Sequence, residues 1–167
     1  MTRLASLALV AALATPVEAS GLEQHYSPGE DLEAIDTALI AQARSSIDMA
    51  AYLVTDWQLQ DDLVLAARRG VAVRLVLDAS EFQRIGGEQQ FAARLQAAGG
   101  VVKVSGGQAL MHLKTMCLDG DVLRFGAANF SRSGLTEQAN DLDIVRGSGV
   151  CDRFEATFER LWDTGSS

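Results

Sequence analysis

Residues 112–129 read HLKTMCLDGDVLRFGAAN and decide much of the expected fold. Apolar residues recur on both sides of Asp119-Gly120, a dipeptide typical of tight hairpin turns. The stretch therefore predicts two antiparallel strands, at about 110–118 and 122–125, joined at this turn.

The same stretch concentrates polar groups that suit one kind of chemistry. His112 and Lys114 are two residues apart, so on a strand both side chains point to the same face. A neutral imidazole beside a fixed cation is a candidate nucleophile toward a phosphate, whose oxygens the ammonium would neutralise. Asn129 could donate amide hydrogens to those oxygens, and Gly126 permits close backbone approach. Taken singly, a strand histidine is more often an ordinary packed or surface residue.

Beyond this stretch, the spacing of apolar residues along the chain predicts a single α/β domain. Apolar residues at helical spacing indicate helices, and dense β-branched runs indicate buried strands. The expected helices lie at 32–44, from about 59 to 70, around 91–98 and around 154–162, and the expected strands at 47–54, 71–77, 101–104 and 142–145. Thr55 with Gln58 resembles a capping box before the second helix. This order predicts a mixed sheet with helices on both faces.

Composition limits the remaining possibilities. The chain has 167 residues, a net charge of −8 and 48% apolar residues. Residues 1–19 resemble a signal peptide, because Arg3 precedes a short apolar run and Ala19 suits a cleavage site. We therefore expect residues 20–167 to form one exported domain, periplasmic or secreted, with no stable membrane span after cleavage. The alternative is that residues 1–19 are not cleaved and act as a short N-terminal membrane anchor. Export permits a disulfide between Cys117 and Cys151, although the sequence alone leaves their pairing open.

His112, Lys114 and Asp119 fit the pattern H-x-K-x4-D, and Gly126 opens a G-A-A-N segment ending at Asn129. This combination resembles the phospholipase D superfamily and its HKD motif. The chain looks like members of the single-motif branch, which includes small bacterial periplasmic endonucleases and Zucchini-type mitochondrial proteins.

The resemblance implies a fold, a mechanism and a partner. It implies that His112, Lys114, Asp119 and Asn129 are the catalytic residues, and that the substrate lies against Gly126, Ala127 and Ser131. In this family two motifs meet at one site, and a phosphohistidine forms without a metal or other cofactor. A chain with one motif is therefore expected to form a homodimer.

Two positions depart from the family pattern. Ala127 stands where serine is common, and Asn140 stands where the small endonucleases have a glutamate that orients the histidine. An amide oxygen can accept that hydrogen bond but cannot stabilise an imidazolium by charge. Glu137 or Asp141 would serve instead if the local register differs.

The expected function is phosphodiester hydrolysis, of the nuclease type on DNA or RNA. Phospholipase D activity that releases phospholipid headgroups is the first alternative, because a strongly acidic chain repels polyanions at long range. A degenerate homologue that binds without turnover is the second alternative, since both Ala127 and Asn140 depart from the pattern.

Overall fold

The computed structural model describes residues 21–107 and 109–166, so the expected signal peptide lies outside the described residues. A seven-stranded sheet has the order β1-β7-β6-β5-β2-β3-β4. The β2–β3 and β3–β4 pairs are parallel and the others are antiparallel. The strands are β1 (Leu22–Ser27), β2 (Ser46–Ala51), β3 (Ala72–Leu77), β4 (Val101–Val104), β5 (Lys114–Leu118), β6 (Val122–Phe125) and β7 (Asn140–Arg146).

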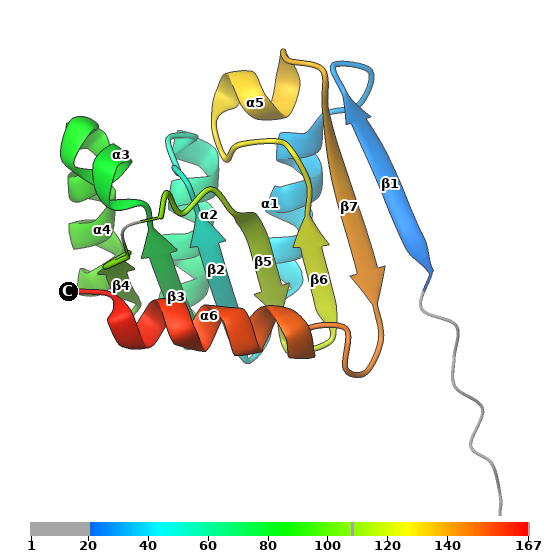
Figure 1. Cartoon of the computed structure of the whole chain (residues 1–167). Helices are drawn as coiled ribbons and strands as arrows, with labels where there is room; N and C mark the ends of the chain where they lie inside the picture. The colour runs from blue at the N-terminus through cyan, green and yellow to red at the C-terminus, as the bar shows by residue number, and fades with distance from the viewer. Residues whose placement is uncertain (1–20, 108, 167) are drawn as a thin grey trace, which may run out of the picture.

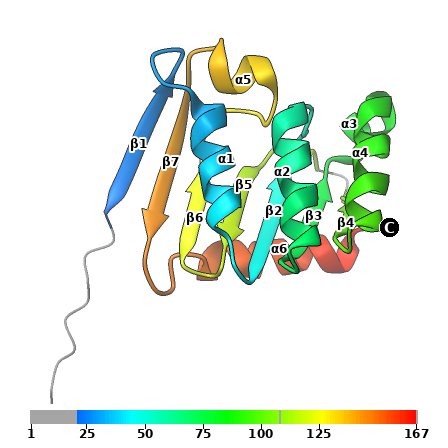
Figure 2. The ribbon, with the colours of Figure 1, turned by 180° about the vertical axis from the view of Figure 1, so that it is seen from behind.

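Helices cover both faces of this sheet, which confirms the expected α/β architecture. The helices are α1 (Leu32–Gln42), α2 (Trp57–Arg68), α3 (Ala79–Arg84), α4 (Gly86–Ala97), α5 (Arg132–Thr136) and α6 (Asp152–Thr164). Helices α1, α2 and α4 lie on one face (Figure 2), and α6 crosses the other (Figure 1). Central strands β2 and β3 are buried between the two layers, which explains their nearly continuous apolar sequences.

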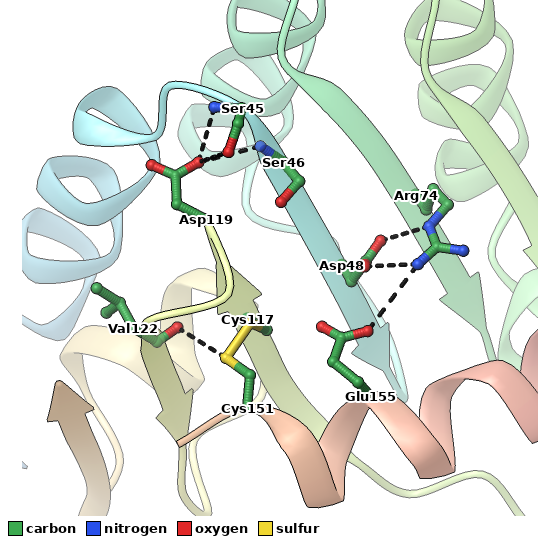
Figure 3. Close-up of a disulfide and its surroundings, with 9 residues drawn as sticks. All are labelled: Ser45, Ser46, Asp48, Arg74, Cys117, Asp119, Val122, Cys151 and Glu155. Atoms are coloured by element: carbon green, nitrogen blue, oxygen red, sulfur yellow. Dashed lines mark hydrogen bonds and ion pairs between the residues drawn. A yellow bond between two sulfur atoms is a disulfide. The ribbon is translucent and has the colours of Figure 1, made fainter. Parts of the chain in front are cut away.

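A disulfide ties α6 to the sheet. Cys117 of β5 is bonded to Cys151, which directly precedes α6 (Figure 3). Phe154 and Phe158 pack in the same apolar cluster as Ala50 of β2. The pairing that the sequence left open is therefore present, and it fixes the start of α6 over the central strands.

The hairpin at Asp119-Gly120 is confirmed, with φ values of 55° and 79°. The strand before it is shorter than expected, because it begins at Lys114 and leaves His112 in the segment just ahead. The capping box was also wrong. Asp56, not Thr55, caps α2, and its carboxylate accepts from the backbone N–H groups of Gln58 and Leu59 at 3.0 Å each.

Candidate active site

His112 lies at the edge of the sheet where β2 and β3 end and β5 begins. Two hydrogen bonds fix the backbone on either side of it. Tyr52 N–H donates to the Leu113 carbonyl at 2.8 Å, and Met111 N–H donates to Asp78 Oδ2 at 3.0 Å. His112 itself is exposed. Hydrogen bonds therefore hold the main chain on both sides of His112, while the His112 side chain is exposed.

Lys114 is the buried cation of the site. It is the first residue of β5 and is only 6% exposed. Its Nζ donates to the carbonyl oxygen of His112 at 2.9 Å. Burial lowers the pKa of the Lys114 ammonium to about 8, because the charged form loses hydration. At neutral pH the group is still mostly charged and lies beside the histidine.

Arg124 holds the start of the strand that carries Lys114. It is fully buried, pairs with Asp36 of α1 at 2.7–2.8 Å and donates to the Lys114 carbonyl at 3.0 Å. Its complete burial and its pairing with Asp36 show that it anchors the start of β5 to α1.

The loop after β6 brings Asn129 to the same edge. Strands β5 and β6 are antiparallel, so the end of β6 lies beside the start of β5. The Phe130 carbonyl accepts from the N–H groups of Thr55 and Asp56, at 2.9 and 3.1 Å, which joins the loop to the segment after β2. Asn129 Oδ1 is buried and has no hydrogen-bond partner among the described residues.

Gly126 and Ala127 shape this loop against β7. Gly126 has φ 146°, and a Cβ there would lie 2.5 Å from the Asp141 carbonyl oxygen. The close approach expected of Gly126 is therefore made to the protein's own backbone. Ala127 is exposed, and its N–H donates to Asp141 Oδ1 at 3.3 Å.

Two members of the predicted site have structural contacts. Asp119 lies at the other end of β5 from His112 and accepts from the N–H groups of Arg44, Ser45 and Ser46 at 2.7–3.1 Å. Figure 3 shows its contacts with Ser45 and Ser46. These hydrogen bonds outweigh partial burial and lower the Asp119 pKa to about 2. Ser131 caps α5 through Oγ, which accepts from Gly134 N–H at 3.1 Å. Asp119 therefore holds the β5–β6 turn against the segment before β2, at the opposite end of β5 from His112.

Two of the three candidates for orienting His112 make other side-chain contacts, and the third is exposed. Asn140 Nδ2 donates to the Gly134 carbonyl at 2.8 Å, and Asp141 accepts from Ala127. Glu137 is exposed on the loop after α5. Within the described residues, none of the three forms a hydrogen bond with the His112 ring.

Tyr52, which directly follows β2, is the site residue that sequence reasoning missed. Its ring centroid lies 4.5 Å from that of His112, and Lys114 Nζ lies 4.9 Å from the ring centre. Its hydroxyl donates to Glu81 at 3.0 Å. The available signal was its position after a buried strand, at the strand ends where α/β sheets place ligands.

Chemically, this end of the strands offers an imidazole, a cation and an amide. An exposed imidazole and a mostly charged lysine that pack near the same tyrosine ring suit chemistry on a negatively charged, tetrahedral phosphorus centre. A cavity of about 540 Å³ lies elsewhere, beside Arg44 and the Asp119 turn. The His112 imidazole lies outside that cavity and is exposed on the surface.

Solved structures share this fold. The phospholipase D family member Nuc from Salmonella typhimurium matches with a TM-score of 0.81 and 21% identity, over 88% of this chain and 97% of that one. NucT from Helicobacter pylori also matches with a TM-score of 0.81, at 16% identity, over 89% of this chain and 99% of that one.

Sequence relatives point the same way. The mitochondrial cardiolipin hydrolase of Homo sapiens is 29% identical over 126 residues, which is 75% of this chain and 48% of that protein. The Chlamydomonas reinhardtii protein of the same name is 23% identical over 124 residues, 74% of this chain and 54% of that protein. The chain thus spans about half the length of these relatives. A family model described as cardiolipin synthase, PLD-like domain, matches residues 37–162. Because that match covers most of the chain, the protein belongs to the phospholipase D-like family.

Proposed function

We propose that this protein is a phosphodiester hydrolase of the nuclease type, with His112 as its nucleophile. The observation that carries the proposal is an exposed imidazole on a fixed backbone, with the buried Lys114 ammonium hydrogen-bonded to the main-chain carbonyl of the same histidine at 2.9 Å. That pair supplies a nucleophile and charge compensation for the phosphoryl oxygens without a metal.

The reaction has two displacements. A nitrogen of His112 forms a bond to phosphorus, and the bond from phosphorus to the leaving oxygen breaks. The His112 imidazolium of a second copy of the chain gives its proton to that oxygen. The same imidazole, now neutral, takes a proton from water, whose oxygen then displaces the phosphohistidine nitrogen. The protein acts as a homodimer because each chain supplies one histidine.

Nucleic acid is the preferred substrate class, because the folds of Nuc and NucT match the whole described domain. The alternative is phospholipid headgroup hydrolysis. It is favoured by the net charge of −8, which repels a polyanion, and by relatives that are named cardiolipin hydrolases. The second alternative is a homologue without turnover, since His112 has no hydrogen bond to a carboxylate among the described residues.

We also propose export to the periplasm or medium. The apolar leader supports it, and so does the Cys117–Cys151 disulfide, because such bonds persist in oxidising compartments. No helix among the described residues is long and apolar enough to span a membrane.

The test incubates purified protein with plasmid DNA, single-stranded DNA, RNA and phosphatidylcholine vesicles, each in EDTA. We expect cleavage of nucleic acid, abolished in His112→Ala. The matched control is His25→Ala, because His25 is the other histidine of the chain and pairs with Glu30 at 2.6 Å on edge strand β1.

Each other outcome has a defined meaning. Product from phosphatidylcholine alone would establish the lipid alternative, and no product from any substrate would favour the non-catalytic one. Activity that disappears in EDTA and returns with a divalent ion would contradict the mechanism.

A further inference from the structure

Among the residues that the structure describes, the His112 ring has no carboxylate partner of the kind that a catalytic imidazole ordinarily uses for orientation. Asn140 and Asp141 form hydrogen bonds elsewhere, and Glu137 is exposed. An exposed imidazole without a partner would sample several rotamers, which reduces the fraction aligned for attack. Something else in the structure must therefore restrict the ring.

Tyr52 contacts both functional groups of the motif. Its ring is tilted by 56° to the His112 ring at a centroid distance of 4.5 Å, within the range of favourable aromatic pairs. The Lys114 ammonium lies 4.9 Å from the same ring centre, within the range of cation–π attraction. One aromatic ring thus lies against both the imidazole and the ammonium.

Tyr52 is itself held at two points. Its N–H donates to the Leu113 carbonyl, between the two motif residues. Its hydroxyl donates to Glu81 of α3, and Glu81 pairs with Arg84 one helical turn later. Because backbone and hydroxyl are both fixed, the ring cannot turn away from His112 without breaking a hydrogen bond.

We infer that Tyr52 is the positioning residue of this site, which orients His112 and Lys114 through its ring in place of a carboxylate. The inference rests on the proposed hydrolase function. The electron-rich face of the ring also attracts an imidazolium, the form that the second copy's His112 takes when it acts as the acid. Tyr52 thereby supplies electrostatic support that Asn140 cannot.

Replacing the ring should separate this role from simple packing. In Tyr52→Leu we expect kcat to fall about ten- to a hundred-fold while KM changes little, since ring contacts of this kind are worth that much. Tyr52→Phe keeps the ring and loses the hydroxyl contact with Glu81, so activity should stay within about threefold of wild type. Tyr26→Leu is the matched control, because Tyr26 is the other tyrosine and is 54% exposed on β1.

A second readout does not depend on turnover. The chain has two histidines, so the imidazole proton signals of His112 and His25 are readily assigned by NMR from single substitutions. The Tyr52 ring current should displace the His112 signals. We expect Tyr52→Leu to remove that displacement, Tyr52→Phe to keep it, and the His25 signals to stay unchanged in both.

The outcomes separate this inference from the proposed function. An inactive wild type with an intact ring-current displacement would defeat the hydrolase proposal. An active wild type with unchanged kcat in folded Tyr52→Leu would overturn the role of Tyr52 alone. If Tyr52→Leu does not fold, Tyr52→Phe decides the matter. Loss of activity in Tyr52→Phe as complete as in His112→Ala would overturn the inference, because the aromatic ring alone would then not keep His112 active.

Discussion

Burial of Lys114 makes its charge sensitive to pH in a range that enzymes experience. Its pKa is lowered to about 8 by loss of hydration, so the ammonium becomes neutral as pH rises through that value. A neutral amine cannot offset the charge on phosphoryl oxygens. We therefore expect kcat/KM to fall above about pH 8.

The check is a pH profile of kcat/KM from 6 to about 10 for wild type and Lys114→Arg. An arginine stays charged throughout this range, so the alkaline decline should disappear, although altered geometry should lower activity overall. An identical decline in the variant would assign the titration to another group.

Asp119 shows how a motif residue can serve the fold. Its carboxylate accepts from three consecutive backbone N–H groups, and its pKa is lowered to about 2. The ionised form is favoured in the folded state. Its contribution to stability is thus complete above the unfolded pKa of about 4 and is lost as pH falls toward about 2.

Asp119→Asn should lower the free energy of unfolding by about 1–2 kcal/mol at neutral pH, because charge-assisted hydrogen bonds become neutral ones. Specific activity at a temperature where the variant is folded should remain near wild type. Urea denaturation and a substrate assay measure the two effects, with the exposed neighbour Asp121→Asn as the control. Lost turnover with unchanged stability would instead make Asp119 catalytic.

At the scale of elements, the sequence predicted those helices, strands and turns whose pattern lies within their own residues. Three kinds of local pattern were sufficient: the apolar runs of β2 and β3, the turn residues Asp119-Gly120, and the apolar stripe of α6. Each such element buries a face that the sequence itself displays. The expected architecture of one mixed sheet with helices on both faces followed from these elements.

Elements that depend on distant partners were not predicted. β1 reads LEQHYS and is ordered by pairing with β7, and α5 has five residues without a periodic stripe. For the same reason the motif revealed His112 and Lys114, but not the Tyr52 ring that lies close to both of them. That contact forms only when the end of β2 meets the start of β5.

The disulfide is expected to stabilise the packing of α6 on the sheet. It links residues separated by 34 positions, and closing a loop of that size contributes about 3–4 kcal/mol by restricting the unfolded chain. The double substitution of Cys117→Ala with Cys151→Ala should therefore lower the free energy of unfolding by about that amount, seen as a lower urea midpoint. Reductant should destabilise the wild type similarly and leave the double variant unchanged. Equal midpoints for oxidised wild type and the variant would contradict this.

At the scale of the whole molecule, the edge that carries His112 also exposes apolar side chains. Leu110 and Leu113 flank the histidine and are 59% and 36% exposed, and Trp57 at the start of α2 is 64% exposed. Exposed apolar residues next to a half-site are suited to burial against a second copy. We therefore expect the dimer to form through this edge, and Leu113→Glu to weaken it in light scattering.

Mixing subunits tests whether the two copies share one site. If wild-type and His112→Ala chains are unfolded together and refolded at random, only dimers with two intact copies hold both the nucleophile and the acid. Activity per total protein should then fall as the square of the wild-type fraction. For the same reason, His112→Ala mixed with Lys114→Ala should show no complementation, because each shared site needs both motifs intact. An independent site in each chain would instead give a linear fall, and a fully active monomer in light scattering would exclude the shared site.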